Sequence, residues 1–232
     1  MSDIRPSGPT PVGNENPFSQ PTPVAASPQG STPSAPAYRC ATQPRDTSAI
    51  LVGCNNSISR YAAGATLQYY FDLDTFETQK EGRRALRHFK KAISAWRPVP
   101  VRFKRVYKRG EAFFSVVASN YDRRVYAEAF FPNDPVESRV LTVYPLAFQN
   151  HKAMYNVFCH ELGHMLGLRH EFAGVSEQQD PSVRLGNANP RSIMNKFANL
   201  FDMTVQEEDI RDVVYFYTCN NVGGIPIDEV MP

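Results

Sequence analysis

The chain has 232 residues, of which 42% are hydrophobic and 21% are charged, and its formal net charge is +2 at pH 7. This length predicts one folded domain of roughly 150 to 180 residues with additional tails. The small net charge gives no argument for binding to nucleic acid, and no run approaches the roughly 18 apolar residues of a membrane span.

Residues 1–39 differ in composition from the rest of the chain. They hold nine of the nineteen prolines and only four charged residues, so they bury too little apolar surface to order themselves. We predict a disordered leader or linker over 1–39, one folded domain over 40–219 and a flexible C-terminal tail over 220–232. The leader has no apolar core after a basic start, and it does not resemble a secretory signal peptide.

The region from residue 66 to 144 shows the periodicities of strands and of one long helix. The helix is predicted over 78–96, because Leu86, Phe89, Ile93 and Trp96 recur at helical spacing. Strands are predicted from alternating or short apolar runs at 67–71, 101–107, 112–118, 125–131 and 139–144.

Basic residues are concentrated between Lys80 and Arg109, where there are twelve of them and one acidic residue. The simpler interpretation is a solvated helix face followed by a solvated strand face. The alternative is attraction to an anionic surface, such as a charged polysaccharide or an acidic substrate.

The residues His160 to His170 form the most informative motif, His-Glu-Leu-Gly-His-Met-Leu-Gly-Leu-Arg-His. On a helix that starts near Lys152, His160 and His164 lie one turn apart on the same face, so both can reach one metal ion. Glu161 is placed to reach a water on that ion. The other two histidines, His88 and His151, are interpreted as surface or helix-end residues.

Gly167 lies where the chain must leave this helix to bring a third ligand back to the metal. A left-handed turn is cheapest at a residue without a side-chain carbon. His170 can then complete a three-histidine zinc site whose fourth position stays open for water, as in catalytic sites.

Two features follow the motif. Asn-Pro at 189–190 favours a turn, and it precedes Met194. A last helix is predicted from the capping-box spacing of Thr204 and Glu207 ahead of an apolar stripe.

The positions His160, Glu161, His164, Gly167 and His170 resemble the motif of the metzincin clan of zinc endopeptidases. Met194 then resembles the methionine of the clan's Met-turn, which lies under the metal. The resemblance implies an α/β (α+β) fold with a twisted mixed sheet of about five strands, three main helices and an active-site cleft along an edge strand. By analogy, 125–131 is that edge. Residues 92–107 resemble the matrixin branch and Glu171 the astacin branch, so the branch stays open.

The function implied by the resemblance is zinc-dependent hydrolysis of peptide bonds in extended protein substrates, with one catalytic Zn²⁺ and Glu161 as general base. The resemblance also implies an extracellular, monomeric enzyme, although the chain as given shows no signal peptide. The alternative function is a secreted, zinc-stabilised binding protein without turnover. Astacins use a tyrosine two residues after the Met-turn methionine, but Lys196 occupies that position, which leaves Tyr144 or Tyr155 as candidates to stabilise the oxyanion.

The sequence contains four cysteines. They allow three pairings, and in an exported protein the favoured disulfides are Cys40 with Cys54 and Cys159 with Cys219. Alternatively, Cys159 is a small buried helix residue. Cys40 also resembles, less closely, the cysteine switch of matrixins, and a disulfide at Cys40 would exclude that role.

Overall fold

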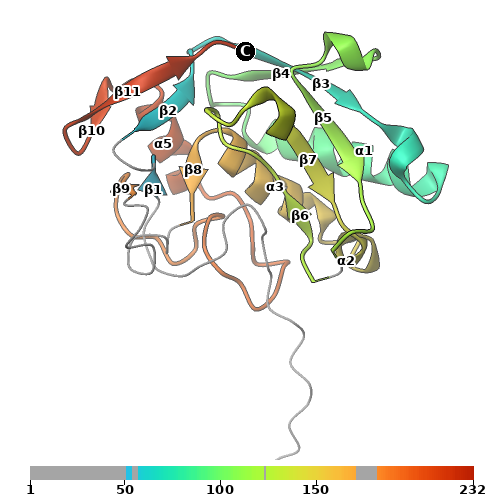
Figure 1. Ribbon diagram of the computed structural model, residues 1–232. Helices are drawn as coiled ribbons and strands as arrows, with labels where there is room; N and C mark the ends of the chain where they lie inside the picture. The colour runs from blue at the N-terminus through green and yellow to red at the C-terminus, as the bar shows by residue number, and fades with distance from the viewer. Residues whose placement is uncertain (1–50, 54–56, 123, 171–181) are drawn as a thin grey trace, which may run out of the picture. The chain divides into compact units, whose positions relative to one another are not determined.

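The structure is a computed structural model (Figure 1), which describes residues 51–53, 57–122, 124–170 and 182–232. These residues belong to the compact unit Ala35–Pro232. The predicted leader, Cys40, Cys54 and Glu171 lie outside the described residues.

A five-stranded sheet forms the framework of this unit, and its strand order is β4-β3-β5-β7-β6. The first four of these strands run parallel, and β6 pairs antiparallel with β7. The mixed five-stranded sheet implied by the metzincin resemblance is therefore confirmed. The strands are β3 (Thr66–Phe71), β4 (Arg102–Val106), β5 (Phe114–Ala118), β6 (Ala127–Glu128) and β7 (Val140–Val143).

The long helix α1 (Gln79–Ala95) packs on α3 (Met154–Met165), and both lie behind the sheet in the view of Figure 1. Thr78 caps α1, because its side chain accepts a hydrogen bond from the Glu81 N–H. Alternation along β3 buries Leu67, Tyr69 and Phe71 on one face. Phe89 of α1 contacts the rings of Tyr69 and Phe158, so the core lies between the sheet and these two helices.

The predicted elements agree with the structure except in two details. The strand expected over 125–131 is only β6, which nevertheless forms an edge of the sheet as expected. The last helix, α5 (Glu207–Phe216), starts from a capping box between Gln206 and Asp209, so the predicted box of Thr204 and Glu207 is wrong. The remaining short elements are η1 (Leu73–Thr75), η2 (Arg109–Glu111), η3 (Val136–Ser138) and α2 (Pro145–Gln149).

The C-terminal segment corrects our prediction of a flexible tail from residue 220. It forms β10 (Asn221–Val222) and β11 (Ile225–Val230), and β11 pairs parallel with β2 (Ile58–Tyr61). The buried guanidinium of Arg60 donates to Glu229 Oε1 at 2.7 Å. Strand pairing and this ion pair join the segment to β2, more than 160 residues away in the sequence, and so order it. Local composition does not reveal such pairing.

A third small sheet joins β1 (Leu51–Val52) to β8 (Leu168–Arg169) and β9 (Val183–Arg184), in the order β8-β1-β9. Because β8 directly follows Gly167, this pairing fixes the chain between the second and third histidines of the motif. Within the part of the chain that is described, no helix is both long and apolar enough to cross a membrane.

The expected disulfide between Cys159 and Cys219 is wrong, because both cysteines are free. Cys159 is fully buried in α3, where burial raises the pKa of its thiol to about 12. The thiol of Cys219 instead donates to the Phe216 carbonyl at 3.6 Å. The alternative interpretation of Cys159 as a small buried residue is confirmed.

Candidate metal centre

Three imidazoles converge at the C-terminal half of α3. His160 and His164 lie one turn apart on this helix, and His170 follows β8. The Nε2 atom of His160 lies 3.1 Å from that of His170 and 3.2 Å from that of His164. Among the described residues, these three side chains form the group of His, Cys, Asp and Glu that could hold a metal ion.

The donor set fits zinc. Three nitrogens bound tetrahedrally at about 2.0–2.1 Å would lie roughly 3.3–3.4 Å apart, which is close to the separations found here. All three imidazoles are buried, with exposed fractions of 0–2%. Burial lowers the pKa of His160 to about 4 and lowers the pKa values of His164 and His170 well below the ordinary value. Each imidazole is thus held neutral, which is the form that binds metal.

The orientation of two imidazoles is fixed by backbone carbonyls. His160 Nδ1 donates to the Ile193 carbonyl at 2.7 Å, and His164 Nδ1 donates to the Leu168 carbonyl at 2.9 Å. Such bonds leave Nε2 with its lone pair directed at the metal position. Neither carbonyl was identified by sequence reasoning, because a backbone carbonyl carries no residue-type signal.

Gly167 makes the turn that was predicted for it. Its φ is +99°, in the left-handed region, and its N–H donates to the His164 carbonyl at 2.9 Å. A Cβ at this position would lie 3.0 Å from Phe216 Cε1 and 3.1 Å from the Ser59 carbonyl oxygen. Both the backbone conformation and the crowding therefore favour glycine here.

Met194 is fully buried and packs against α3. A Cβ on Gly163, which lies between the two helical histidines, would be 2.5 Å from Met194 Sδ. The Met194 N–H donates to Ser192 Oγ at 3.1 Å, which closes the turn locally.

Asp209 connects this turn to α5, and sequence analysis missed it. Its Oδ2 accepts hydrogen bonds from the N–H groups of Ile193 at 3.0 Å and Gln206 at 2.8 Å. The carboxylate is fully buried, and burial raises its pKa. One carboxylate thus holds the residue, Ile193, whose carbonyl orients His160.

Glu161 is buried on α3, where it directly follows His160. Strand β6 packs beside the same helix. On β6, Glu128 accepts a hydrogen bond from the Tyr144 hydroxyl at 2.8 Å. Burial, this bond and the nearby charges of Glu128, Asp122 and Glu161 raise the pKa of Tyr144. Of the two candidate tyrosines, Tyr144 thus lies within the electrostatic reach of Glu161. Tyr155 lies instead beneath the ammonium of Lys91, which is 4.4 Å from its ring centre.

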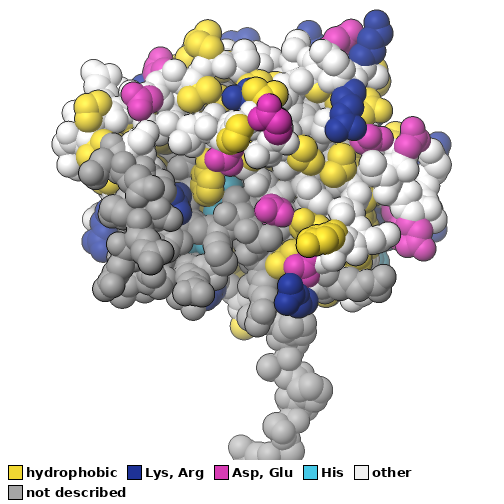
Figure 2. All heavy atoms as spheres, viewed as in Figure 1, with side chains coloured by type: hydrophobic (Ala, Val, Ile, Leu, Met, Phe, Trp, Pro, Cys, Tyr) yellow, Lys and Arg dark blue, Asp and Glu magenta, His cyan; other side chains and the backbone are white. Residues whose placement is uncertain are grey.

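A small pocket of about 190 Å³ lies next to the histidines. Phe131 lines it and contacts the His164 ring edge-to-face at 5.5 Å between ring centres, while Gly167 and Arg169 form another part of its wall. In Figure 2 a small histidine surface is visible in a recess on this face of the molecule.

Comparison with known families and structures agrees with this geometry. Residues 104–208 match the Reprolysin_5 family, described as metallo-peptidase family M12, and this range contains the three histidines, Glu161 and Met194. No curated protein matches the chain.

Two solved structures share the fold at low sequence identity. The structure of myroilysin has a TM-score of 0.51 and 12% identity, and the match covers 74% of this chain and 100% of that chain. The GM1-bound form of the ECX AB5 holotoxin has a TM-score of 0.51 and 15% identity, over 75% of this chain and 91% of that chain.

Proposed function

From its metzincin-like metallopeptidase domain, we propose that this chain is a zinc-dependent endopeptidase that hydrolyses peptide bonds in extended protein substrates. The observation that carries the proposal is the convergence of three neutral imidazoles beside Glu161. A bound zinc ion would lower the pKa of a coordinated water toward neutrality and polarise the scissile carbonyl.

Glu161 acts as the general base in this proposal. Its carboxylate accepts a proton from the attacking water and then passes that proton to the leaving amine. A carboxylate that exchanges protons this way must stay unligated, and the three imidazoles already supply a complete ligand set. The chain's own contribution is to hold the imidazoles neutral and oriented through the carbonyls of Ile193 and Leu168.

The substrate binds along the outer edge of β6 in this proposal. β6 pairs only with β7 within the described sheet, so its other edge offers backbone groups to an extended peptide. Backbone pairing demands little of the peptide's sequence, and the pocket lined by Phe131 and Arg169 would accept one of its side chains.

The test is cleavage of an unstructured protein, with and without a metal chelator. We expect cleavage by the wild-type chain, its loss with chelator and its return with zinc. Glu161→Gln should remove turnover while one zinc per chain stays bound, as measured by elemental analysis. Glu207→Gln, an exposed α5 residue, is the matched control and should keep full activity.

The alternative, a zinc-stabilised secreted binding protein, predicts a different pattern in the same experiment. Such a protein would bind one zinc and cleave nothing in either form. This alternative is tested because the fold is shared with a structure described as a holotoxin. Undiminished cleavage by the Gln variant would instead refute the role of Glu161. A secreted, monomeric state is part of the proposal and is measured by fractionation and by light scattering.

A further inference from the structure

A second pocket lies at the edge of the five-stranded sheet opposite to β6. It has a volume of about 480 Å³ and lies between the end of α1 and the start of β4. The edge strands β4 and β6 are separated by four inter-strand steps, on the order of 20 Å. None of the described residues that line this pocket belongs to the group of three histidines, so the pocket is a separate site.

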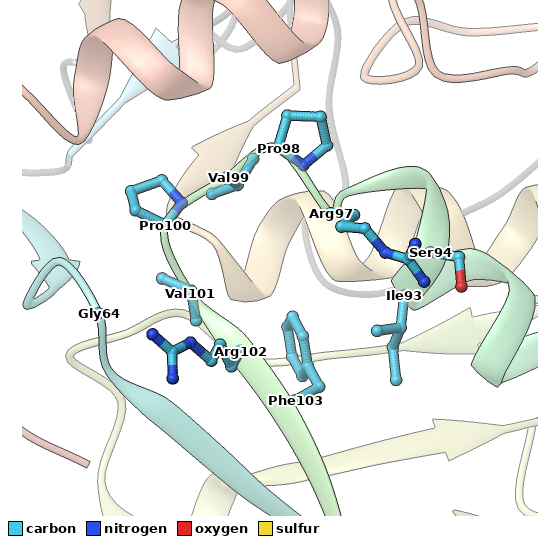
Figure 3. A pocket seen from close by; sticks show the side chains of 10 residues that line it. All are labelled: Gly64, Ile93, Ser94, Arg97, Pro98, Val99, Pro100, Val101, Arg102 and Phe103. Carbon is cyan, nitrogen blue, oxygen red and sulfur yellow. The ribbon is translucent and has the colours of Figure 1, made fainter.

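The lining combines apolar and basic side chains. In Figure 3 the guanidinium groups of Arg97 and Arg102 lie on opposite sides of Phe103. Ile93 lies on the side of Arg97, and Val101 lies on the side of Arg102. Among the described residues, no Asp or Glu lines the pocket. Within the described ranges, neither of these guanidinium groups forms an ion pair.

The backbone around the pocket is held in place before any ligand binds. The N–H of Gly64 donates to the Pro100 carbonyl at 2.6 Å, and the N–H of Arg102 donates to the Ala65 carbonyl at 2.9 Å. Pro98 and Pro100 restrict φ within this connection. Trp96, which begins it, is buried and donates through Nε1 to the Cys159 carbonyl of α3 at 2.9 Å. A preformed site loses little conformational entropy on binding.

We propose that this pocket binds an acidic peptide segment of a protein substrate, at a distance from the scissile bond. Two unpaired arginines on either side of an apolar floor match carboxylates that flank an apolar side chain. The pocket lies within the segment that carries twelve basic residues and one acidic residue, so the surrounding potential also favours an anion. The outer edge of β4 adds backbone groups for an extended segment.

This proposal rests on the proposed function, because it assumes that the bound protein is cleaved. Binding to the pocket is nevertheless measured without turnover. A labelled peptide with glutamates around one central leucine is titrated with the full chain carrying Glu161→Gln, and anisotropy reports binding. Combining Arg97→Glu with Arg102→Glu should weaken binding at least about tenfold. The control, Arg83→Glu with Arg87→Glu, makes the same charge change on exposed α1 residues and should change affinity by less than about threefold.

Three outcomes would contradict the proposal. Equal weakening by both double variants would mean diffuse attraction rather than a site. Absence of binding would overturn it, and so would pocket-dependent binding of a sulfated polysaccharide with none of the peptide.

Replacing the central leucine of the peptide by glycine should weaken binding, because the apolar floor of the pocket then loses its contact.

A second measurement joins the pocket to turnover. An acidic tail attached to a cleavable peptide through a spacer of at least about six residues, enough to cross the sheet, should raise kcat/KM. The increase should disappear in the Arg97→Glu, Arg102→Glu variant, while the tail-free peptide is cleaved equally well. If the wild-type chain cleaves neither peptide, the proposed function fails, and the anisotropy result still decides whether the pocket binds.

Discussion

The Ile193 backbone joins the metal centre to the last helix: its carbonyl accepts a hydrogen bond from His160 Nδ1 at 2.7 Å, while its N–H donates to Asp209 Oδ2 at 3.0 Å. The imidazole orientation therefore depends on a carboxylate that lies outside the group of three histidines. Outer partners of metal ligands contribute to affinity because they fix the tautomer and direction of each ring.

Asp209→Asn should weaken zinc binding by about 10- to 100-fold, a typical loss when such an outer partner is changed. The neutral amide oxygen is a weaker acceptor than the carboxylate for the two N–H groups that Asp209 Oδ2 now serves. Competition with a chromophoric chelator measures the affinity. Glu207→Gln in the same helical turn is the control, and equal affinities in both variants would exclude the proposed positioning role.

Gly167→Ala should lower the free energy of unfolding for two separable reasons. The left-handed conformation costs a residue with a Cβ roughly 1–2 kcal/mol, and the added Cβ also crowds Phe216 and the Ser59 carbonyl. Gly64→Ala is the matched control, because Gly64 has φ +86° and an added Cβ there meets nothing within 4 Å. Denaturant unfolding should show the larger loss at Gly167, and similar losses would mean that crowding contributes nothing.

The metal-free protein should lose stability as the pH falls from about 6.5 to about 4. Burial lowers the pKa of His160 to about 4 in the folded state, so in this window the unfolded chain binds more protons than the folded chain. Stability therefore rises with pH across the window and is complete above the unfolded pKa. Thermal unfolding in chelator follows the change. His160→Gln should reduce the slope, which keeps the contributions of His164 and His170, and an unchanged slope would contradict the assigned cause.

Removal of residues 221–232 should destabilise the protein by several kcal/mol, because β2 loses its parallel partner and buried Arg60 loses Glu229. Deleting only Met231 and Pro232, which follow β11, is the control and should have little effect. Chemical denaturation of the three chains gives the comparison. Equal stability of all three would restore the view that this segment is a dispensable tail.

The sequence by itself determined the group of three histidines that could hold a metal, the left-handed turn at Gly167 and most of the sheet and helix positions. These features depend on local spacing: a helix brings residues four apart onto one face, and alternation defines the strands of a half-buried sheet. The mixed sheet, with β6 at its edge, followed from the resemblance that this local motif carries.

Only the tertiary structure decided which distant groups meet. The carbonyl partner of His160, the role of Asp209, the pairing of β11 with β2 and the separation of Cys159 from Cys219 all join residues remote in sequence. Backbone carbonyls and paired strand edges leave no signature in residue type. Their partners are set by how the helices and sheet pack, which local periodicity does not specify.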